Sequence, residues 1–233
     1  MAEGRLGRFP SADGFPGPAF FTGTEPDLGT MAGRFTLAHN LGVPTVFADQ
    51  VHGTDLIWVD AVPTAQVTVA GHGDALATRL PGVALVIRTA DCLPVLMADV
   101  AAGLVAAVHV GWRGLLGGIL PRVVEELVAA GATPAGLYAS VGPGICGRCY
   151  EVGEDVARPA AAAGHRVMRT SLGQTYLDLA GSAVQQLTSL GLEHVTDVKV
   201  CTATSPGYYS YRVQGPKAGR QGGIVARVAS DTP

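Results

Sequence analysis

Alternating apolar and polar positions divide most of the chain after residue 45 into short strands. Some runs, such as 83–89 and 104–109, are apolar at nearly every position, which is typical of strands in sheets covered on both faces. The predicted strands are Ala19–Thr22, Thr45–Ala48, Asp55–Val59, Ala75–Thr78, Val83–Thr89, Val95–Asp99, Leu104–His109, Leu137–Val141, Val195–Cys201 and Ile224–Val228. Several of them are therefore expected to lie in buried sheets.

Helical periodicity is clearest at Leu115–Ala130, where apolar residues recur on one face and Gly131 supplies a stop. Two further helices are predicted at Gly153–Ala163 and Tyr176–Leu190. Residues 1–30 are rich in Gly and Pro and read as an irregular N-terminal segment. Mixed strands and helices without repeats or linkers predict an α/β fold: a single domain over residues 1–233, with layered mixed β-sheets flanked by helices in an α/β/β/α-like order.

Composition narrows the function. The 233 residues carry 16 basic and 19 acidic side chains, a formal charge of -3, with no basic run that could follow a phosphate backbone. Nucleic acid is therefore not an expected partner. Apolar runs fall short of the roughly 20 residues of a spanning helix, and no secretory signal precedes the fold, so a cytoplasmic location without membrane contact is expected. Four cysteines are too few for a disulfide framework and favour metal binding or catalysis.

Three candidate metal ligands stand at the ends of predicted strands or in the turns that follow them: His52, Cys92 and His109. Imidazole nitrogen and thiolate sulfur are preferred ligands of zinc, and three protein ligands leave a fourth position for water or substrate. The residues lie 40 and 17 positions apart, so only the fold can bring them together. Taken singly, the histidines could equally be ordinary hydrogen-bonded residues, and Cys92 a small buried apolar one.

The flanking residues add a resemblance. The segments that carry it are Gln50-Val51-His52-Gly53, Thr89-Ala90-Asp91-Cys92-Leu93-Pro94, His109-Val110-Gly111-Trp112-Arg113-Gly114, Gly142–Gly153, Cys201-Thr202, Tyr209–Arg212 and Gly219-Arg220. Together they resemble the laccase-domain family, which is named for polyphenol oxidase activity and is also described as purine nucleoside phosphorylases. The resemblance covers about residues 45–228. It implies that His52, Cys92 and His109 bind zinc, with copper as the alternative metal.

The chain departs from the family pattern in two places. Phe20–Gly23 only partly matches the family's Thr-Thr-Arg segment, and nothing in 24–33 matches its Leu-Asn-Leu-Gly segment, which leaves substrate preference open. Gly147-Arg148-Cys149 stands where the family more often has Pro-Cys-Cys, which creates a Cys-x-x-Cys spacing at Cys146 and Cys149. A redox dithiol or a zinc knuckle fits this spacing. The preferred interpretation is a loop with Cys149 facing the substrate site.

Roles for the other candidates follow from the chemistry. Asp91 and Glu151 are candidate acid-base groups. The alternative role for Asp91 is a carboxylate that orients a metal ligand. The alternative for Glu151 is a residue at the start of a helix. Arg113 is a candidate phosphate ligand, with a structural ion pair as the alternative. Backbone N–H groups near Gly142 and Gly144 offer a second anion contact. Gln50, Cys149 and Arg212 complete the predicted substrate site.

Other positions are assigned unremarkable roles. His72 and Asp74 lead into a predicted strand, and a site-lining role is the alternative there. Tyr208, Tyr209 and Tyr211 are typical of a half-buried strand, although they could stack on a purine.

The predicted function is that of a zinc-dependent purine nucleoside phosphorylase. It would convert adenosine, inosine and S-methyl-5'-thioadenosine to the free base and ribose 1-phosphate, with adenosine deamination as a side activity. The alternatives are a copper-dependent polyphenol oxidase, a hydrolase with Cys92 as nucleophile and His109 as base, and a zinc-stabilised binding module. Multicopper oxidation needs many histidines, typically in His-x-His pairs, and the chain has six histidines and no such pair. The sequence identifies no protein partner.

Overall fold

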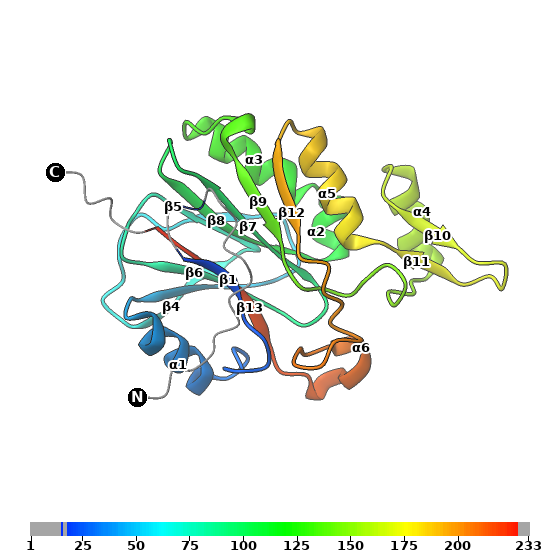
Figure 1. Ribbon diagram of the computed structural model, residues 1–233, viewed down its shortest axis with the longest axis horizontal. Coiled ribbons are helices and arrows are strands. Elements are labelled where there is room, and N and C mark those ends of the chain that lie inside the picture. The colour runs from blue at the N-terminus through cyan, green and yellow to red at the C-terminus, as the bar shows by residue number, and fades with distance from the viewer. Residues whose placement is uncertain (1–14, 16–17, 228–233) are drawn as a thin grey trace.

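The computed structural model describes residue 15 and residues 18–227. Two stacked β-sheets form its centre (Figure 1). The five-stranded sheet runs β1 (Ala19–Phe21), β13 (Gln221–Ala226), β6 (Ala84–Thr89), β2 (Thr45–Asp49), β4 (Val67–His72). The six-stranded sheet runs β12 (His194–Asp197), β9 (Tyr138–Val141), β7 (Leu93–Asp99), β8 (Leu104–Val110), β5 (Ala75–Thr78), β3 (Leu56–Trp58).

Helices cover the outer face of each sheet (Figure 1). The helix α1 (Met31–Leu41) packs on the five-stranded sheet, and α2 (Trp112–Gly117), α3 (Ile119–Ala129) and α5 (Leu179–Ser189) pack on the six-stranded sheet. The remaining elements are α4 (Glu154–Ala162), the hairpin β10 (Val167–Arg169) and β11 (Thr175–Leu177), α6 (Tyr211–Gln214), and 3-10 turns at Pro134–Gly136 and Gly215–Lys217. The predicted α/β class with layered mixed sheets and outer helices is confirmed.

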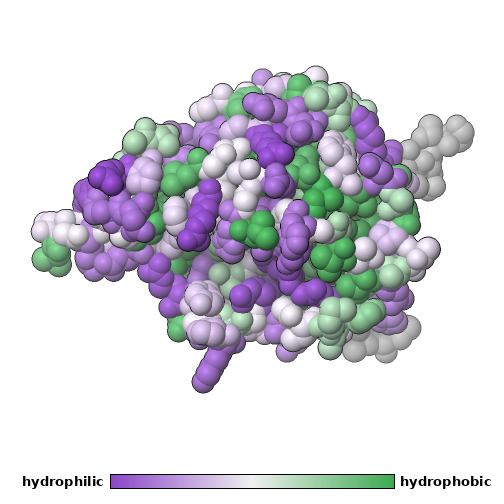
Figure 2. Space-filling model, turned by 180° about the vertical axis from the view of Figure 1, so that it is seen from behind, coloured by the Kyte–Doolittle hydropathy of each residue, from purple (hydrophilic) through white to green (hydrophobic). Residues whose placement is uncertain are grey.

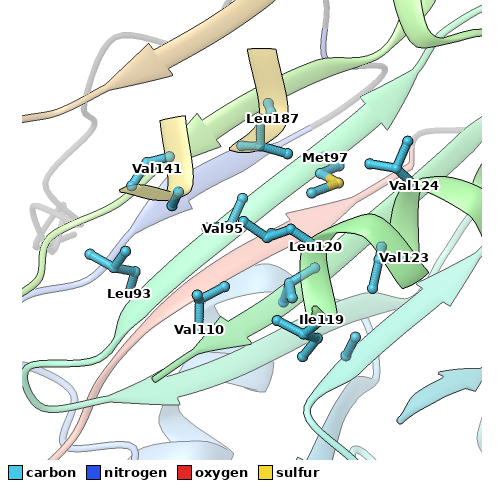
Figure 3. Packing of buried hydrophobic residues seen from close by; sticks show 14 of the residues in the cluster. Leu93, Val95, Met97, Val110, Ile119, Leu120, Val123, Val124, Val141 and Leu187 are labelled. Atoms are coloured by element: carbon cyan, nitrogen blue, oxygen red, sulfur yellow. The ribbon is translucent and has the colours of Figure 1, made fainter. Parts of the chain in front are cut away.

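The apolar side chains of the central strands pack into two cores, one between the sheets and one beneath the outer helices. This follows because successive side chains of a strand point to opposite faces. In β7, Val95 and Met97 pack toward Leu120 and Leu187 of the outer helices (Figure 3). Leu96 lies between them in sequence and packs into the core between the two sheets. A strand buried on both faces needs apolar residues at every position, as the sequence shows here.

The structure differs from the predicted elements where local pattern is weak. The helix expected at Leu115–Ala130 is two helices, because Gly118 adopts a left-handed conformation with φ of 80° between them. The helix expected from Tyr176 begins at Leu179, since residues 175–177 pair with β10 instead. The strand expected to reach Cys201 ends at Asp197.

The sequence did not predict α1, β4, the β10–β11 hairpin, α6 or the two 3-10 turns, and the type expected around residue 210 was wrong. The helix α1 buries only three residues, so its apolar stripe is faint, and β4 is an edge strand without a buried residue. The tyrosines near residue 210 lie in a loop and in α6 rather than in a strand. Of the N-terminal segment expected to be irregular, 1–14 and 16–17 lie outside the described residues, as does Val228 of the last predicted strand.

Polar and apolar side chains are interspersed over the face opposite to that of Figure 1, and the α4–β10–β11 region projects to one side (Figure 2). In the described part of the chain, no helix has both the length and the apolar character needed to cross a membrane. The cytoplasmic location stays a prediction.

Candidate active site and metal centre

The structure brings the three predicted metal ligands together. His52 lies in the loop after β2, Cys92 directly precedes β7, and His109 lies in β8. Antiparallel pairing of β7 with β8 sets Pro94 opposite His109, which places Cys92 near the imidazole. The ligand atoms of all three residues lie within 4.8 Å of one another, with Cys92 Sγ 3.9 Å from His52 Nε2. We call these three residues the metal centre.

A buried carboxylate holds both histidines in place. Asp74 accepts a hydrogen bond from His109 Nδ1 at 2.6 Å, and its oxygens also accept the backbone N–H groups of Val51, His52 and Gly53 at 3.2, 3.0 and 2.6 Å. The bond to Nδ1 leaves His109 Nε2 as the atom that could bind a metal. Burial raises the pKa of Asp74, but the bonds from His109 and Gly53 outweigh it and lower the pKa overall.

Gly111 is required by the close approach of two ligands. A Cβ atom at this position would lie 3.1 Å from both Cys92 Sγ and His52 Cδ2. The His-Val-Gly-Trp segment thus supplies a ligand and, two residues later, the space that the other ligands occupy. His52 itself has a φ of 60°, a left-handed conformation that turns its ring toward His109, with ring centroids 4.8 Å apart.

Cys92 and His109 form a coupled pair, and a metal would have to displace the proton that the His109 imidazole holds. Burial raises the pKa of Cys92, but the charge and hydrogen bond of His109 lower it to about 6. Burial lowers the pKa of His109, while the Cys92 thiolate and Asp74 raise it to about 9. The sulfur is therefore a thiolate near neutral pH, the form that binds metals. One thiolate and two imidazoles fit Zn²⁺, and the same donor set also fits a mononuclear copper ion.

The metal centre opens into a cavity of about 620 Å³, a size typical of small-molecule sites. We call it the main cavity. It is lined by Gln50, His52, Arg88, Thr89, Ala90, Asp91, Cys92, His109, Trp112, Arg113, Tyr150, Tyr211, Arg212 and Arg220. Four of these side chains are guanidinium groups, and Asp91 is the only carboxylate among them. The excess of positive charge favours an anionic ligand.

Arg88 has one N–H group that makes no hydrogen bond to the described residues. It extends from the buried strand β6, and its Nε is buried without a hydrogen-bond partner among the described residues. Burial and the nearby charges of Arg34 and Arg220 lower the pKa of Arg88 to about 10. Two other guanidinium groups rest on aromatic rings: Arg113 over Trp112, and Arg212 over the ring of Tyr150. An anion in the main cavity could accept a hydrogen bond from the unpaired Nε of Arg88.

Four of the other predicted site residues reach the main cavity: Gln50, Asp91, Arg113 and Arg212. Gln50 exchanges two hydrogen bonds with the backbone of Arg88, at 2.8 and 3.0 Å. Asp91 accepts bonds from Thr202 Oγ1 and from the backbone N–H of Arg212, both at 2.6 Å. Both Asp91 oxygens thus already accept a hydrogen bond.

The structure does not place the other four among the residues that line the main cavity. A Cβ at Gly142 would lie 2.3 Å from the Phe21 ring, and one at Gly144 2.4 Å from Leu93, so both glycines permit close packing. Glu151 is exposed and bridges to Tyr176 of β11. Cys149 has its sulfur beside those of two other cysteines.

Sequence reasoning assigned no site role to Arg88, Trp112, Tyr150 and Arg220, and gave a site role to Asp74 and Tyr211 only as an alternative. An arginine inside the apolar run 83–89 was the strongest available signal, since a charge there needs a partner. Asp74 carried a weaker signal, as an acidic residue at the start of a buried strand.

Known proteins are similar to this chain in sequence and in fold. A family model described as multi-copper polyphenol oxidoreductase laccase matches residues 29–228. A purine nucleoside phosphorylase of Deinococcus radiodurans is 43% identical over 179 residues, covering 76% of this chain and 68% of the relative. An adenosine deaminase from an unknown prokaryotic organism is 34% identical over 209 residues, covering 83% of this chain and 80% of the relative. The crystal structure of YlmD from Geobacillus stearothermophilus superposes with a TM-score of 0.82 at 26% identity, covering 95% of this chain and 94% of that one.

Proposed function

The chain belongs to the multi-copper polyphenol oxidoreductase laccase family, and from that premise we propose that it is a zinc-dependent purine nucleoside phosphorylase. The substrates are adenosine, inosine and S-methyl-5'-thioadenosine, and the products are the free base and ribose 1-phosphate, or its methylthio analogue. The observation that carries this proposal is one cavity that joins a His-Cys-His metal centre to four arginines. Relatives named purine nucleoside phosphorylase support the substrate class.

The reaction breaks the bond between purine N9 and ribose C1′ and forms a bond between C1′ and a phosphate oxygen. The electron pair of the broken bond goes to the purine, which takes up a proton. Arg88 and Arg113 hold the phosphate, because guanidinium groups match its oxygens with paired donors. His52, Cys92 and His109 would hold Zn²⁺, which would supply Lewis-acid chemistry when bound.

Aromatic side chains complete the nucleoside site. Burial and the Cys92 and Asp91 charges raise the pKa of Tyr150 to about 12, so its phenol stays protonated and can donate a hydrogen bond. Tyr211 lines the same cavity and is half exposed, which leaves its ring free to stack on a purine. We assign Arg212 and Gln50 to the same wall, where they orient the nucleoside.

Deamination of adenosine is the proposed side activity, in which water replaces the exocyclic amine at C6 and ammonia leaves. A relative named adenosine deaminase supports it. Asp91 is the one carboxylate among the lining residues of the main cavity, so we assign the proton transfer to Asp91. To act in this way, Asp91 has to exchange its bond to Thr202 or to the Arg212 backbone.

Incubation of metal-analysed protein with adenosine, with and without inorganic phosphate, tests the proposal. Adenine and ribose 1-phosphate should form only with phosphate, and inosine should form slowly in both reactions. Identification of the products by chromatography and mass spectrometry separates the two activities. Absence of adenine in the phosphate reaction, with zinc present at the metal centre, would overturn phosphorolysis.

Arg113→Lys tests the phosphate role. Lysine keeps the charge but loses the paired donors, so the KM for phosphate should rise about tenfold, equivalent to about 1.4 kcal/mol. The rate of deamination should change much less, because that reaction uses no phosphate. Steady-state kinetics of both reactions provide the measurement. An equal loss in both would instead indicate a structural role for Arg113.

A further inference from the structure

Three cysteines outside the metal centre form a second group of convergent sulfur atoms. Cys146 and Cys149 lie in the loop after β9, and Cys201 lies in the loop after β12. Their sulfur atoms are all within 4.8 Å of one another, and all three cysteines are partly exposed free thiols. We call these three residues the thiol cluster.

Backbone contacts hold the two loops of the thiol cluster together. Gly144 and Cys201 form a parallel bridge, in which Thr202 N–H donates to the Gly144 carbonyl at 3.0 Å. The Cys146 carbonyl accepts the N–H groups of Cys149 and Tyr150 at 2.9 and 3.0 Å, which closes the Cys-x-x-Cys turn. This spacing with a distant third cysteine is typical of metal-binding cysteines. The sulfur positions are therefore set by backbone geometry.

The environment of Cys201 favours a thiolate. Its sulfur accepts the backbone N–H of Cys146 at 3.4 Å. Burial raises the pKa of Cys201, but this bond and the Thr204 hydroxyl lower it to about 7. Burial and the two neighbouring sulfurs raise the pKa of Cys149 to about 12. Three adjacent sulfurs cannot all ionise without a cation, because like charges at this distance repel.

We propose that Cys146, Cys149 and Cys201 form a second metal site, which binds Zn²⁺ through three thiolates. Zinc–sulfur bonds of about 2.3 Å place tetrahedral sulfur ligands about 3.8 Å apart, so the thiol cluster needs only a small contraction. No imidazole belongs to this group of ligand atoms in the described part of the chain. The donor set is therefore softer than that of the metal centre and selects a thiophilic cation.

A cavity of about 400 Å³ gives the metal access and a fourth ligand from solution. Cys146 lines it together with Arg148, Arg166 and Asp178. The Asp178 carboxylate already accepts the N–H of Gly181 at 2.9 Å and pairs with Arg166 at 3.2 Å, so it is not assigned as a ligand. The two arginines offset the negative charge of a zinc ion with three thiolates.

The second site would act on the main cavity through the loops that it joins. Tyr150 follows Cys149 and lines the main cavity, and Thr202 follows Cys201 and donates to Asp91 at 2.6 Å. Zinc at the thiol cluster would fix both residues by tying the two loops together. Its role is therefore structural and separate from the chemistry at the metal centre.

Zinc stoichiometry in single-site variants tests this proposal. Protein purified with reductant and without chelator should contain two zinc ions per chain, measured by plasma mass spectrometry. Cys201→Ser and His52→Ala should each retain one, and the double variant none. After Co²⁺ substitution, His52→Ala should keep strong thiolate-to-cobalt absorption from three sulfurs, whereas Cys201→Ser should keep only the weaker band from Cys92. Ser205→Ala, a change of a partly exposed hydroxyl in the Cys201 loop, is the matched control with two zinc ions.

Wild-type protein provides a measurement that no folding defect can disturb. Iodoacetamide should leave Cys146, Cys149 and Cys201 unmodified in the zinc-loaded protein and modify them after chelation, as identified by peptide mass. Equal zinc content in folded Cys201→Ser and wild type would overturn the proposal. Alkylation of these cysteines in protein that holds zinc, or a Cys146–Cys149 disulfide under reducing conditions, would also overturn it.

Discussion

At the scale of single residues, one carboxylate organises the metal centre. Asp74 bonds the His109 ring and the backbone of the His52 loop, so two ligands depend on the same buried group. Carboxylates that orient a ligand imidazole strengthen metal binding without touching the metal. Asp74 is therefore a positioning residue, and its contribution can be measured apart from turnover.

Asp74→Asn should weaken zinc binding at the metal centre by about 10–100-fold, the range seen when such orienting groups are removed. The amide is isosteric, but it accepts fewer hydrogen bonds and carries no charge to support His109. Competition with a chromophoric chelator gives the Kd. Asp55→Asn is the matched control, because that exposed carboxylate pairs with Arg122 rather than with a ligand. Unchanged zinc affinity in Asp74→Asn would contradict the positioning role.

Cys92 distinguishes a metal enzyme from a thiol enzyme. Asp74, His109 and Cys92 form a chain that could also activate a nucleophile. The second imidazole, His52, 3.9 Å from the sulfur, instead supports a metal ligand. If Cys92 binds zinc, the loaded protein should resist iodoacetamide and keep its activity, and chelation should expose the sulfur.

The pH dependence of alkylation follows from the pKa of Cys92, which is lowered to about 6. In chelator-treated protein, the alkylation rate should therefore be near its maximum at pH 8, and fall as the pH drops through 6. Peptide mass spectrometry separates Cys92 from the thiol cluster. Rapid alkylation of Cys92 in zinc-loaded protein, with parallel loss of activity, would favour the nucleophile.

At the scale of elements, strand pairing and helix breaks decide which residues meet. The β7–β8 hairpin brings Cys92 and His109 together through its register. The break at Gly118 then lets α2 end and α3 turn across the six-stranded sheet. The β7–β8 register thus positions two of the three predicted ligands.

Gly118→Ala should lower the free energy of unfolding by about 1 kcal/mol, because alanine is strained at a φ of 80°. No atom lies within 4 Å of the added Cβ, so the cost is conformational rather than steric. Gly118→Asn is the control and should lose less, since asparagine tolerates left-handed conformations better. Urea unfolding gives both values. A larger loss for asparagine than for alanine would contradict this explanation.

At the scale of the whole molecule, stability rests on cores on both faces of the central sheets. Leu96 of β7 lies in the core between the sheets, near Gly223 of β13 in the opposite sheet. Leu96→Ala should cost about 2–5 kcal/mol, through lost burial and the cavity left behind.

The matched control is Leu172→Ala, because Leu172 is 86% exposed and its removal should change stability by less than about 0.5 kcal/mol. Thermal and denaturant unfolding of both variants provide the measurement. Equal stability of Leu96→Ala and wild type would show that the inter-sheet core repacks around the missing side chain.

The sequence by itself determined the features that local chemistry encodes. Apolar runs buried on both faces predicted the layered sheets. Imidazole and thiol groups at strand ends, together with the family resemblance of their flanking segments, predicted His52, Cys92 and His109 as one group, which the structure brings together. Tertiary structure alone decided the rest. Asp74 meets His109 across 35 positions, and Cys201 meets Cys146 across 55, through strand pairing that no local pattern records. Periodicity reports which face of a strand is buried, whereas the identity of its neighbours depends on register and crossover between distant segments.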